Sequence, residues 1–215
     1  MNPLKPKRIG LDLDNTLIDY ADSARNVAAQ EGFSNVQSLS DLRDLCKESD
    51  NEKWQRLQAQ LYTDGLDYAT PADSSTTFLS EAKNLGATIF IVSHKTSTTP
   101  PKYGARDLRT PAREWLANWD IVPHYLPDDH VFFCDTLQDK VTKIRELDLD
   151  WFIDDLREVF ENPGFPEHTT SWLYRATESE ECPYRETASK NSIIRPEAFN
   201  FADLIAVLEV ENDSA

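Results

Sequence analysis

Cysteine, positive charge and long apolar runs are all scarce in this sequence of 215 residues. Its three cysteines, Cys46, Cys134 and Cys182, lie far apart and show no CxxC or CxxH spacing. Their number and spacing argue against a disulfide framework and against a zinc site. We therefore expect reduced thiols and a cytoplasmic protein.

No apolar run approaches the length of a membrane span. The longest runs, such as residues 89–92, are far shorter than the roughly 20 residues that cross a bilayer. The first eight residues hold Lys5, Lys7 and Arg8 but lead directly into a short strand pattern, unlike an export signal. We expect no membrane partner.

Basic residues are outnumbered by acidic ones, 22 against 38, which gives a formal net charge of −16. Such a surface repels phosphate backbones unless basic groups gather locally. We therefore expect no long nucleic acid as a partner, and a merely soluble acidic surface explains most of the charge.

The sequence does contain enough apolar residues, 40%, for one sizeable core. Strand patterns occupy residues 9–14, 87–92, 131–134, 151–153 and 170–174. Helical patterns occupy residues 74–85, 110–119, 139–147 and 199–210, a helical insertion covers residues 22–68, and residues 95–109 form a loop. Strands that alternate with helices predict an α/β fold with a doubly wound, mostly parallel, Rossmann-like sheet. Ligands bind such sheets at the carboxyl ends of the strands.

Two carboxylates, Asp12 and Asp14, stand two residues apart at the end of the first predicted strand. Phosphoryl transfer needs a nucleophile, a cation for the phosphate oxygens and an acid for the leaving oxygen. A DxD pair at this point can supply the nucleophile and the acid and can hold a hard cation. Taken alone, the pair is also compatible with a turn or a helix cap.

The stretch at residues 10–17, GLDLDNTL, resembles the first motif of the haloacid dehalogenase-like (HAD) phosphatases. Three further elements follow in that family's order: an apolar strand before Ser93, Lys140 at a helix start, and an apolar strand before Asp154 and Asp155. Each has a plainer explanation by itself, namely a turn, a solvated lysine and a helix N-cap. Together they resemble the family over most of the chain.

The resemblance implies an enzyme with Asp12 as nucleophile and Asp14 as acid/base. It further implies phosphate-binding residues and a Mg²⁺ site. The implied phosphate-binding residues are Thr16, Ser93 and Lys140, and the implied Mg²⁺ ligands are Asp12, Asp14, Asp154 and Asp155.

The resemblance also implies a division into two parts. Residues 1–17 and 74–215 would form the HAD-like core, and residues 18–73 a small helical cap of the C1 type. Such a cap closes over the substrate and excludes bulky molecules, so a small phosphorylated metabolite is the expected partner. An insertion that only adds surface is the alternative.

The substrate is not fixed by the sequence. Basic residues crowd the segment after Ser93, and those that we expect to contact substrate are His94, Lys95, Arg106 and Arg109. An ordinary solvated loop is the alternative. The cap type favours a nucleotide. By contrast, residues 94–96 with Tyr103 and Asp107 resemble uncharacterised HAD proteins of bacterial surface-polysaccharide loci, which favours a phosphosugar.

Two functions from other classes compete with a phosphatase. One is a catalytically inactive phosphate-binding or scaffolding protein with the same fold. The other is a receiver-like signalling module, which the helical insertion after the first strand disfavours. A homodimer is left open.

Overall fold

The computed structural model describes residues 8–49, 51–175 and 200–213. Five strands form one sheet in the order β5-β4-β1-β6-β7, and every neighbouring pair is parallel. These strands are β1 (Arg8–Leu11), β4 (Thr88–His94), β5 (Val131–Cys134), β6 (Trp151–Asp154) and β7 (Thr170–Leu173). The α/β, Rossmann-like fold predicted from the sequence is thereby confirmed, with β1 in the centre of the sheet.

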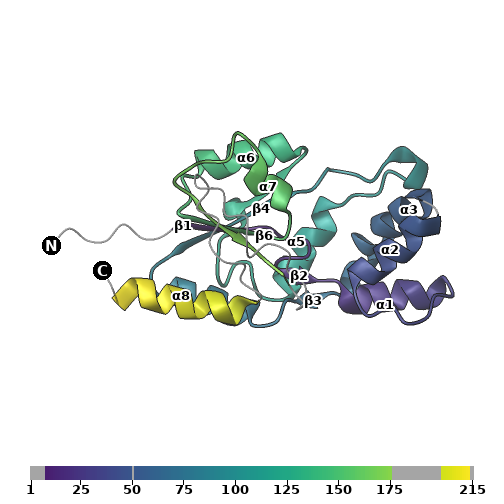
Figure 1. The fold of residues 1–215 in the computed structure, drawn as a ribbon, viewed down its shortest axis with the longest axis horizontal. Helices are drawn as coiled ribbons and strands as arrows, with labels where there is room; N and C mark the ends of the chain where they lie inside the picture. The colour runs from purple at the N-terminus through teal and green to yellow at the C-terminus, as the bar shows by residue number, and fades with distance from the viewer. Residues whose placement is uncertain (1–7, 50, 176–199, 214–215) are drawn as a thin grey trace, which may run out of the picture.

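Helices cover both faces of the sheet (Figure 1). They are α4 (Ser75–Asn84), α5 (Arg109–Asn118), α6 (Leu137–Glu146), α7 (Arg157–Glu161) and α8 (Phe201–Asp213). Alternate residues of each strand point to opposite faces. In β4, Ile89 and Ile91 therefore join the cluster built with α4, α5 and α8, whereas Phe90 and Val92 join the cluster built with α6 and α7. Apolar residues on both faces of β4 explain its continuous apolar sequence.

Three helices follow the first loop: α1 (Ala21–Gln30), α2 (Leu39–Ser49) and α3 (Asn51–Leu61). They share a hydrophobic cluster of their own, which includes Val27, Leu42 and Leu57. A two-stranded antiparallel pair, β2 (Ile18–Asp19) with β3 (Thr70–Pro71), joins this unit to the sheet. The 3-10 helix η1 (Asp64–Tyr68) precedes β3. We call α1–α3 with η1 the helical unit.

The segment after β4 has more structure than the loop predicted for it. Thr98 and Asp107 form an antiparallel bridge, and a short 3-10 helix, η2 (Pro101–Tyr103), lies at the tip. The Thr99 amide donates to the Arg106 carbonyl at 2.8 Å, which closes the two arms. We call residues 95–108 the hairpin. The sequence did not reveal the hairpin because its arms lack the alternating apolar residues that mark strands. Prolines and a glycine lie between the paired residues instead.

Element boundaries differ from the sequence expectation by a few residues. Helix α1 begins at Ala21, one residue before the predicted insertion, and the Ala21 amide donates to the Asp19 side chain. Helix α6 begins at Leu137 because the Thr136 side chain accepts from the Asp139 amide and caps it. The 3-10 helix η3 (Asp128–His130) precedes β5. None of the helices in the described ranges has the length and apolar character needed to cross a membrane.

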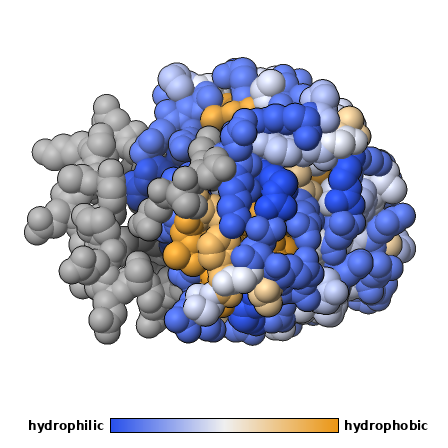
Figure 2. Space-filling view, turned by 90° about the vertical axis from the view of Figure 1, so that its right-hand side faces the viewer, coloured by the Kyte–Doolittle hydropathy of each residue, from blue (hydrophilic) through white to orange (hydrophobic). Residues whose placement is uncertain are grey.

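The face of the molecule that carries the helical unit is mostly hydrophilic (Figure 2). This agrees with the large excess of acidic residues in the sequence.

Candidate functional site

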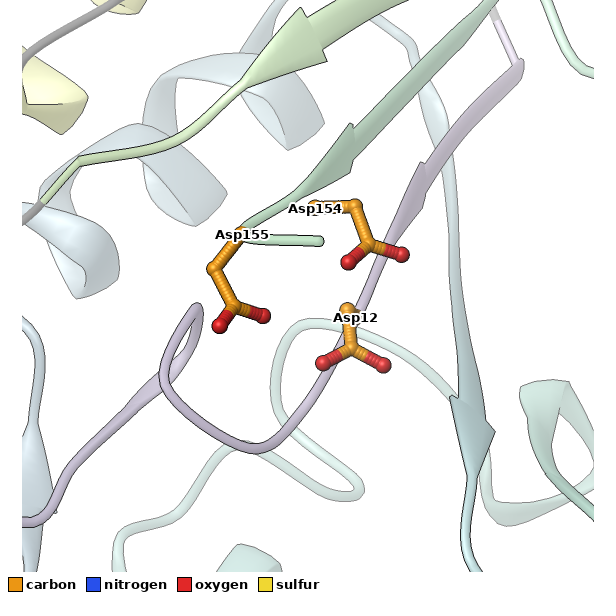
Figure 3. A group of neighbouring side chains, drawn as sticks. All are labelled: Asp12, Asp154 and Asp155. Atoms are coloured by element: carbon orange, nitrogen blue, oxygen red, sulfur yellow. The ribbon is translucent and has the colours of Figure 1, made fainter. Parts of the chain in front are cut away.

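The carboxyl ends of β1 and β6 lie side by side and bring three acids together. Asp12 follows β1, Asp154 ends β6 and Asp155 comes next. The Asp12 amide donates to the Ile153 carbonyl at 2.8 Å, which extends the pairing of β1 with β6 to this point. One carboxylate oxygen of each acid lies within 4.8 Å of the others, and Figure 3 shows the three side chains pointing to one place.

A buried lysine completes this cluster. The Lys140 ammonium lies 2.6 Å from the Asp12 carboxylate and 2.6 Å from the Asp154 carboxylate. Its helix, α6, starts just after β5, so the first turn of the helix directs the side chain toward the end of the sheet. Only 1% of the Lys140 surface is exposed, so it is not the solvated lysine of the plainer interpretation.

Charges in this cluster perturb one another strongly. Burial, together with Asp154 and Asp14, raises the pKa of Asp12 to about 7 although Lys140 opposes the rise. Burial, together with Asp12 and Asp154, raises the pKa of Asp155 well above its usual range. Burial disfavours the charged form of Lys140, but Asp12 and Asp154 outweigh it and raise the pKa of that ammonium. Three acids around one lysine therefore leave an excess of negative charge that a cation would relieve.

Asp14 does not join this cluster through its carboxylate. The Lys95 ammonium lies 2.8 Å from one oxygen of Asp14, and the Tyr20 hydroxyl donates to the other at 2.6 Å. The same ammonium lies 4.6 Å from the centre of the Tyr62 ring. Asp14 still lines the cavity beside Asp12, although its carboxylate is not part of the three-acid cluster.

The remaining predicted phosphate-binding residues differ in their surroundings. Ser93 is 1% exposed and lines the cavity together with Asp12 and Lys140. Thr16 is fully buried, and its hydroxyl accepts from the Asp155 amide at 3.1 Å, so its role here is to hold the loop after β6. The Leu156 amide donates to Asp154 at 2.8 Å and fixes the same loop. Helix α7 begins at Arg157, after Leu156, and no side chain caps it, so the helix-cap interpretation of this acid pair is wrong.

The four residues expected to contact substrate do not lie together. His94 and Lys95 line the cavity, with Lys95 bound to Asp14. Arg106 and Arg109 are not among its lining residues. Arg106 forms a two-pronged ion pair with Asp64 of η1, and Arg109 binds Asp135 at 2.7 Å and the Lys95 carbonyl at 3.0 Å. These contacts hold the hairpin in place.

Several cavity residues were missed in the sequence. They are Tyr62, Gln55 and Gln58 of α3 and its following turn, and Tyr103 of the hairpin tip. Tyr20, which binds Asp14, was missed as well. No local motif marks them, because they reach the site only when the helical unit and the hairpin pack against each other. The Tyr103 hydroxyl contacts the Gln55 side chain at 3.2 Å across that junction.

A scan of protein-family models finds no match for this sequence, and a search of curated proteins finds no relative. Solved structures do match. A haloacid dehalogenase-like hydrolase from Streptococcus pneumoniae has a TM-score of 0.58 at 13% identity, covering 94% of this chain and 98% of that one. A predicted phosphatase from Clostridium acetobutylicum has a TM-score of 0.55 at 16% identity, covering 94% and 98%.

A third similar structure is that of protein tyrosine kinase A from Mycobacterium tuberculosis. Its TM-score is 0.57 at 16% identity, with coverage of 95% of this chain and 99% of that one. The resemblance expected from the motifs is thereby confirmed for the fold. Since one of these neighbours is named a kinase and another a phosphatase, the fold alone does not decide the activity.

Proposed function

From the fold that the chain shares with HAD-like hydrolases, and from its acidic cluster, we propose that it is a Mg²⁺-dependent phosphohydrolase acting on a small phosphomonoester. One observation carries the proposal. The Lys140 ammonium bridges two of the three carboxylates, Asp12 and Asp154, beside a cavity that Asp14 and Ser93 also line. A nucleophile, an acid/base and phosphate-binding groups are thus present in one place.

The cluster suits Mg²⁺. Magnesium prefers hard oxygen ligands and often binds to one or two carboxylates together with substrate phosphate. Asp12, Asp154 and Asp155 offer such oxygens, and their excess negative charge fits a divalent cation. When bound, the ion would neutralise charge on the phosphate oxygens. Asp14 would contribute through its backbone carbonyl, since its carboxylate is bound to Tyr20 and Lys95.

In the first step a carboxylate oxygen of Asp12 attacks phosphorus, and the bond from phosphorus to the leaving oxygen breaks. Asp14 gives its proton to the leaving oxygen, so an alcohol departs and an aspartyl phosphate remains on Asp12. Ser93 and Lys140 hold the equatorial oxygens of the phosphoryl group.

In the second step Asp14, now a carboxylate, takes a proton from water. The water oxygen bonds to phosphorus and the bond from phosphorus to Asp12 breaks. Inorganic phosphate leaves, Asp12 regains its carboxylate and Asp14 is again protonated. The helical unit would act as the cap that excludes bulk water during both steps.

The wider setting is proposed on the same basis. The partner is a small phosphorylated metabolite in the cytoplasm, with no nucleic acid or membrane involved. An inactive phosphate-binding protein is the alternative, and no observation among the described residues favours it over an enzyme.

Replacing the nucleophile tests the proposal. Asp12→Asn should lower the hydrolysis of p-nitrophenyl phosphate in Mg²⁺ by at least about a thousandfold, because the amide is not a nucleophile. The fold should survive, since Lys140 keeps Asp154 as a partner. Phosphate release and circular dichroism measure the two effects.

The matched control is Asp129→Asn, the same change at an exposed acid of η3. It should keep wild-type activity. Hydrolysis by Asp12→Asn at the wild-type rate would rule out the aspartyl phosphate, and inactivity of the wild-type chain with every phosphomonoester would favour the inactive alternative.

A further inference from the structure

The cavity beside Asp12 has a volume of about 460 Å³. Its reacting groups occupy the end of the sheet, and its other walls come from two elements. Helix α3 and its following turn contribute Gln55, Gln58, Ala59 and Tyr62, and the hairpin contributes Thr96, Thr99, Pro100, Tyr103 and Leu108. Because Asp14 lines the same cavity, the leaving group that it protonates must lie between these two elements.

The two elements offer the leaving group uncharged contacts. Apart from Lys95, which is paired with Asp14, their lining side chains are amides, hydroxyls, aromatic rings and small apolar groups, which carry no charge at neutral pH. Burial raises the pKa of Tyr62 further above its ordinary value, so its hydroxyl stays protonated. Amides and hydroxyls are suited to binding other hydroxyl groups.

The cations near this cavity are already paired. Within the cavity, Lys140 binds Asp12 and Asp154, and Lys95 binds Asp14. The other basic residues of the hairpin and those at the start of α5 do not line it, and each pairs with an acid: Lys102 with Glu52, Arg106 with Asp64, Arg109 with Asp135 and Arg113 with Asp128. These basic residues therefore attach the hairpin to its neighbours. The pairs Lys102–Glu52 and Arg106–Asp64 reach the helical unit.

We infer that the leaving group is neutral and bears hydroxyl groups, as a sugar or a nucleoside does; this rests on the proposed phosphohydrolase function. Among the described lining residues, Lys140 and Lys95 already contact carboxylates and the His94 ring contacts the Asp135 carbonyl at 3.2 Å, so a second phosphate or a carboxylate on the leaving group would find no free cationic partner. It would also be repelled by the surrounding acidic chain, whose formal net charge is −16. An anion buried without a partner is strongly unfavourable.

Matched pairs of substrates test this inference. The two members of each pair differ in one anionic group on the leaving group: glucose 1-phosphate with glucuronic acid 1-phosphate, and a nucleoside 5′-monophosphate with its 3′,5′-bisphosphate. We call the substrate whose leaving group is uncharged the neutral member of a pair and the other the anionic member. With Mg²⁺ present, and in the pair that is hydrolysed faster, kcat/KM for the neutral member should exceed that for the anionic member by at least about tenfold. Preference for the first pair identifies a sugar, and preference for the second a nucleoside.

A ratio near one, or a preference for the anionic members, would overturn the inference. Hydrolysis of p-nitrophenyl phosphate is measured in parallel. If the aryl phosphate is hydrolysed but neither neutral substrate is, the inferred leaving group is wrong although the proposed function stands. If the aryl phosphate is not hydrolysed at all, the proposed function itself fails.

Two variants test whether pairing of the cations with acids is the reason why anionic leaving groups are disfavoured. Asp64→Asn releases the Arg106 side chain, which lines a neighbouring hollow together with Ala59 and Tyr103 of the cavity wall, whereas Arg106→Gln breaks the same pair and leaves no cation. Both partners are exposed, so the fold should tolerate either change. The ratio of anionic to neutral kcat/KM should rise about threefold or more in Asp64→Asn relative to Arg106→Gln. Equal ratios in the two variants would contradict the role of the ion pair.

Discussion

Asp14 shows how single residues set the chemistry of this site. Its carboxylate is held by Tyr20, just before the helical unit, and by Lys95, just after β4. Burial and the nearby Asp14 raise the pKa of Tyr20 well above its usual range, so the tyrosine remains a hydrogen-bond donor. Two donors from different parts of the chain therefore fix the direction of the proposed acid/base.

Removing one of these donors should misplace the acid. Lys95→Met should lower kcat/KM about tenfold or more for an alkyl phosphate, whose poor leaving group needs the proton. It should lower kcat/KM less for p-nitrophenyl phosphate, whose leaving group departs without one. Steady-state kinetics with the two substrates measure the difference.

Lys83→Met, the same substitution on the exposed side of α4, is the matched control and should leave both values unchanged. An equal loss for the two substrates would show that Lys95 supports the fold or binds phosphate instead of orienting Asp14.

At the scale of elements, β1 depends on a glycine that the pattern of apolar residues does not explain. A Cβ atom at Gly10 would lie 2.4 Å from Leu149 Cδ1 and 2.7 Å from Phe152 Cδ2. Both neighbours are fully buried in the cluster under α6 and α7. The absent side chain therefore leaves the space that these two residues fill beside the strand that ends in Asp12.

Gly10→Ala should destabilise the protein by about 1–3 kcal/mol, the usual result of overpacking a core. Urea denaturation measures the free energy of unfolding. Leu149→Val removes part of the clash, so the double variant should lose less stability than the two single losses predict. Strictly additive losses would show that the clash is relieved in another way.

At the scale of the whole molecule, the acidic cluster should link stability to pH and Mg²⁺. The pKa of Asp12 is raised from 3.8 to about 7 in the folded chain. Between these values the folded state binds more protons than the unfolded state, so stability without metal falls as pH rises through that window. Magnesium needs the ionised carboxylate and should offset this loss.

The increase in Tm caused by saturating Mg²⁺ should therefore be larger at pH 8 than at pH 5.5. At a Mg²⁺ concentration about a hundred times Kd, the free energy of unfolding should rise by about 2.7 kcal/mol, which corresponds to an increase in Tm of roughly 5–10 °C for a chain of this size. Differential scanning fluorimetry measures it, with Asp12→Asn as the control whose response depends less on pH. The same Mg²⁺ effect at both pH values would argue against Asp12 as a ligand.

The sequence by itself determined the sheet and the position of the main acids. Continuous apolar strands such as residues 88–92 can only be buried on both faces, and parallel strands place their carboxyl ends on one edge. Asp12 and Asp155 follow such strands, Asp154 ends one and Ser93 is next to the end of β4, so their common edge of the sheet was predictable, and the resemblance to the HAD motifs joined them into one site. Lys140 was expected there only from the resemblance to the HAD motifs, because a lysine at a helix start is by itself usually solvated.

Only the tertiary structure decided the surroundings of Asp14 and the walls of the cavity. The Asp14 contact with Lys95, the Arg106 contact with Asp64 and the Tyr103 contact with Gln55 each join segments that no local periodicity relates. Long polar side chains form ion pairs and hydrogen bonds with the groups that lie within reach once the helical unit and the hairpin have packed together. The fold thus follows from local pattern, whereas the position of Arg106 and Arg109 outside the cavity does not, because each pairs with an acid that only the tertiary structure brings near.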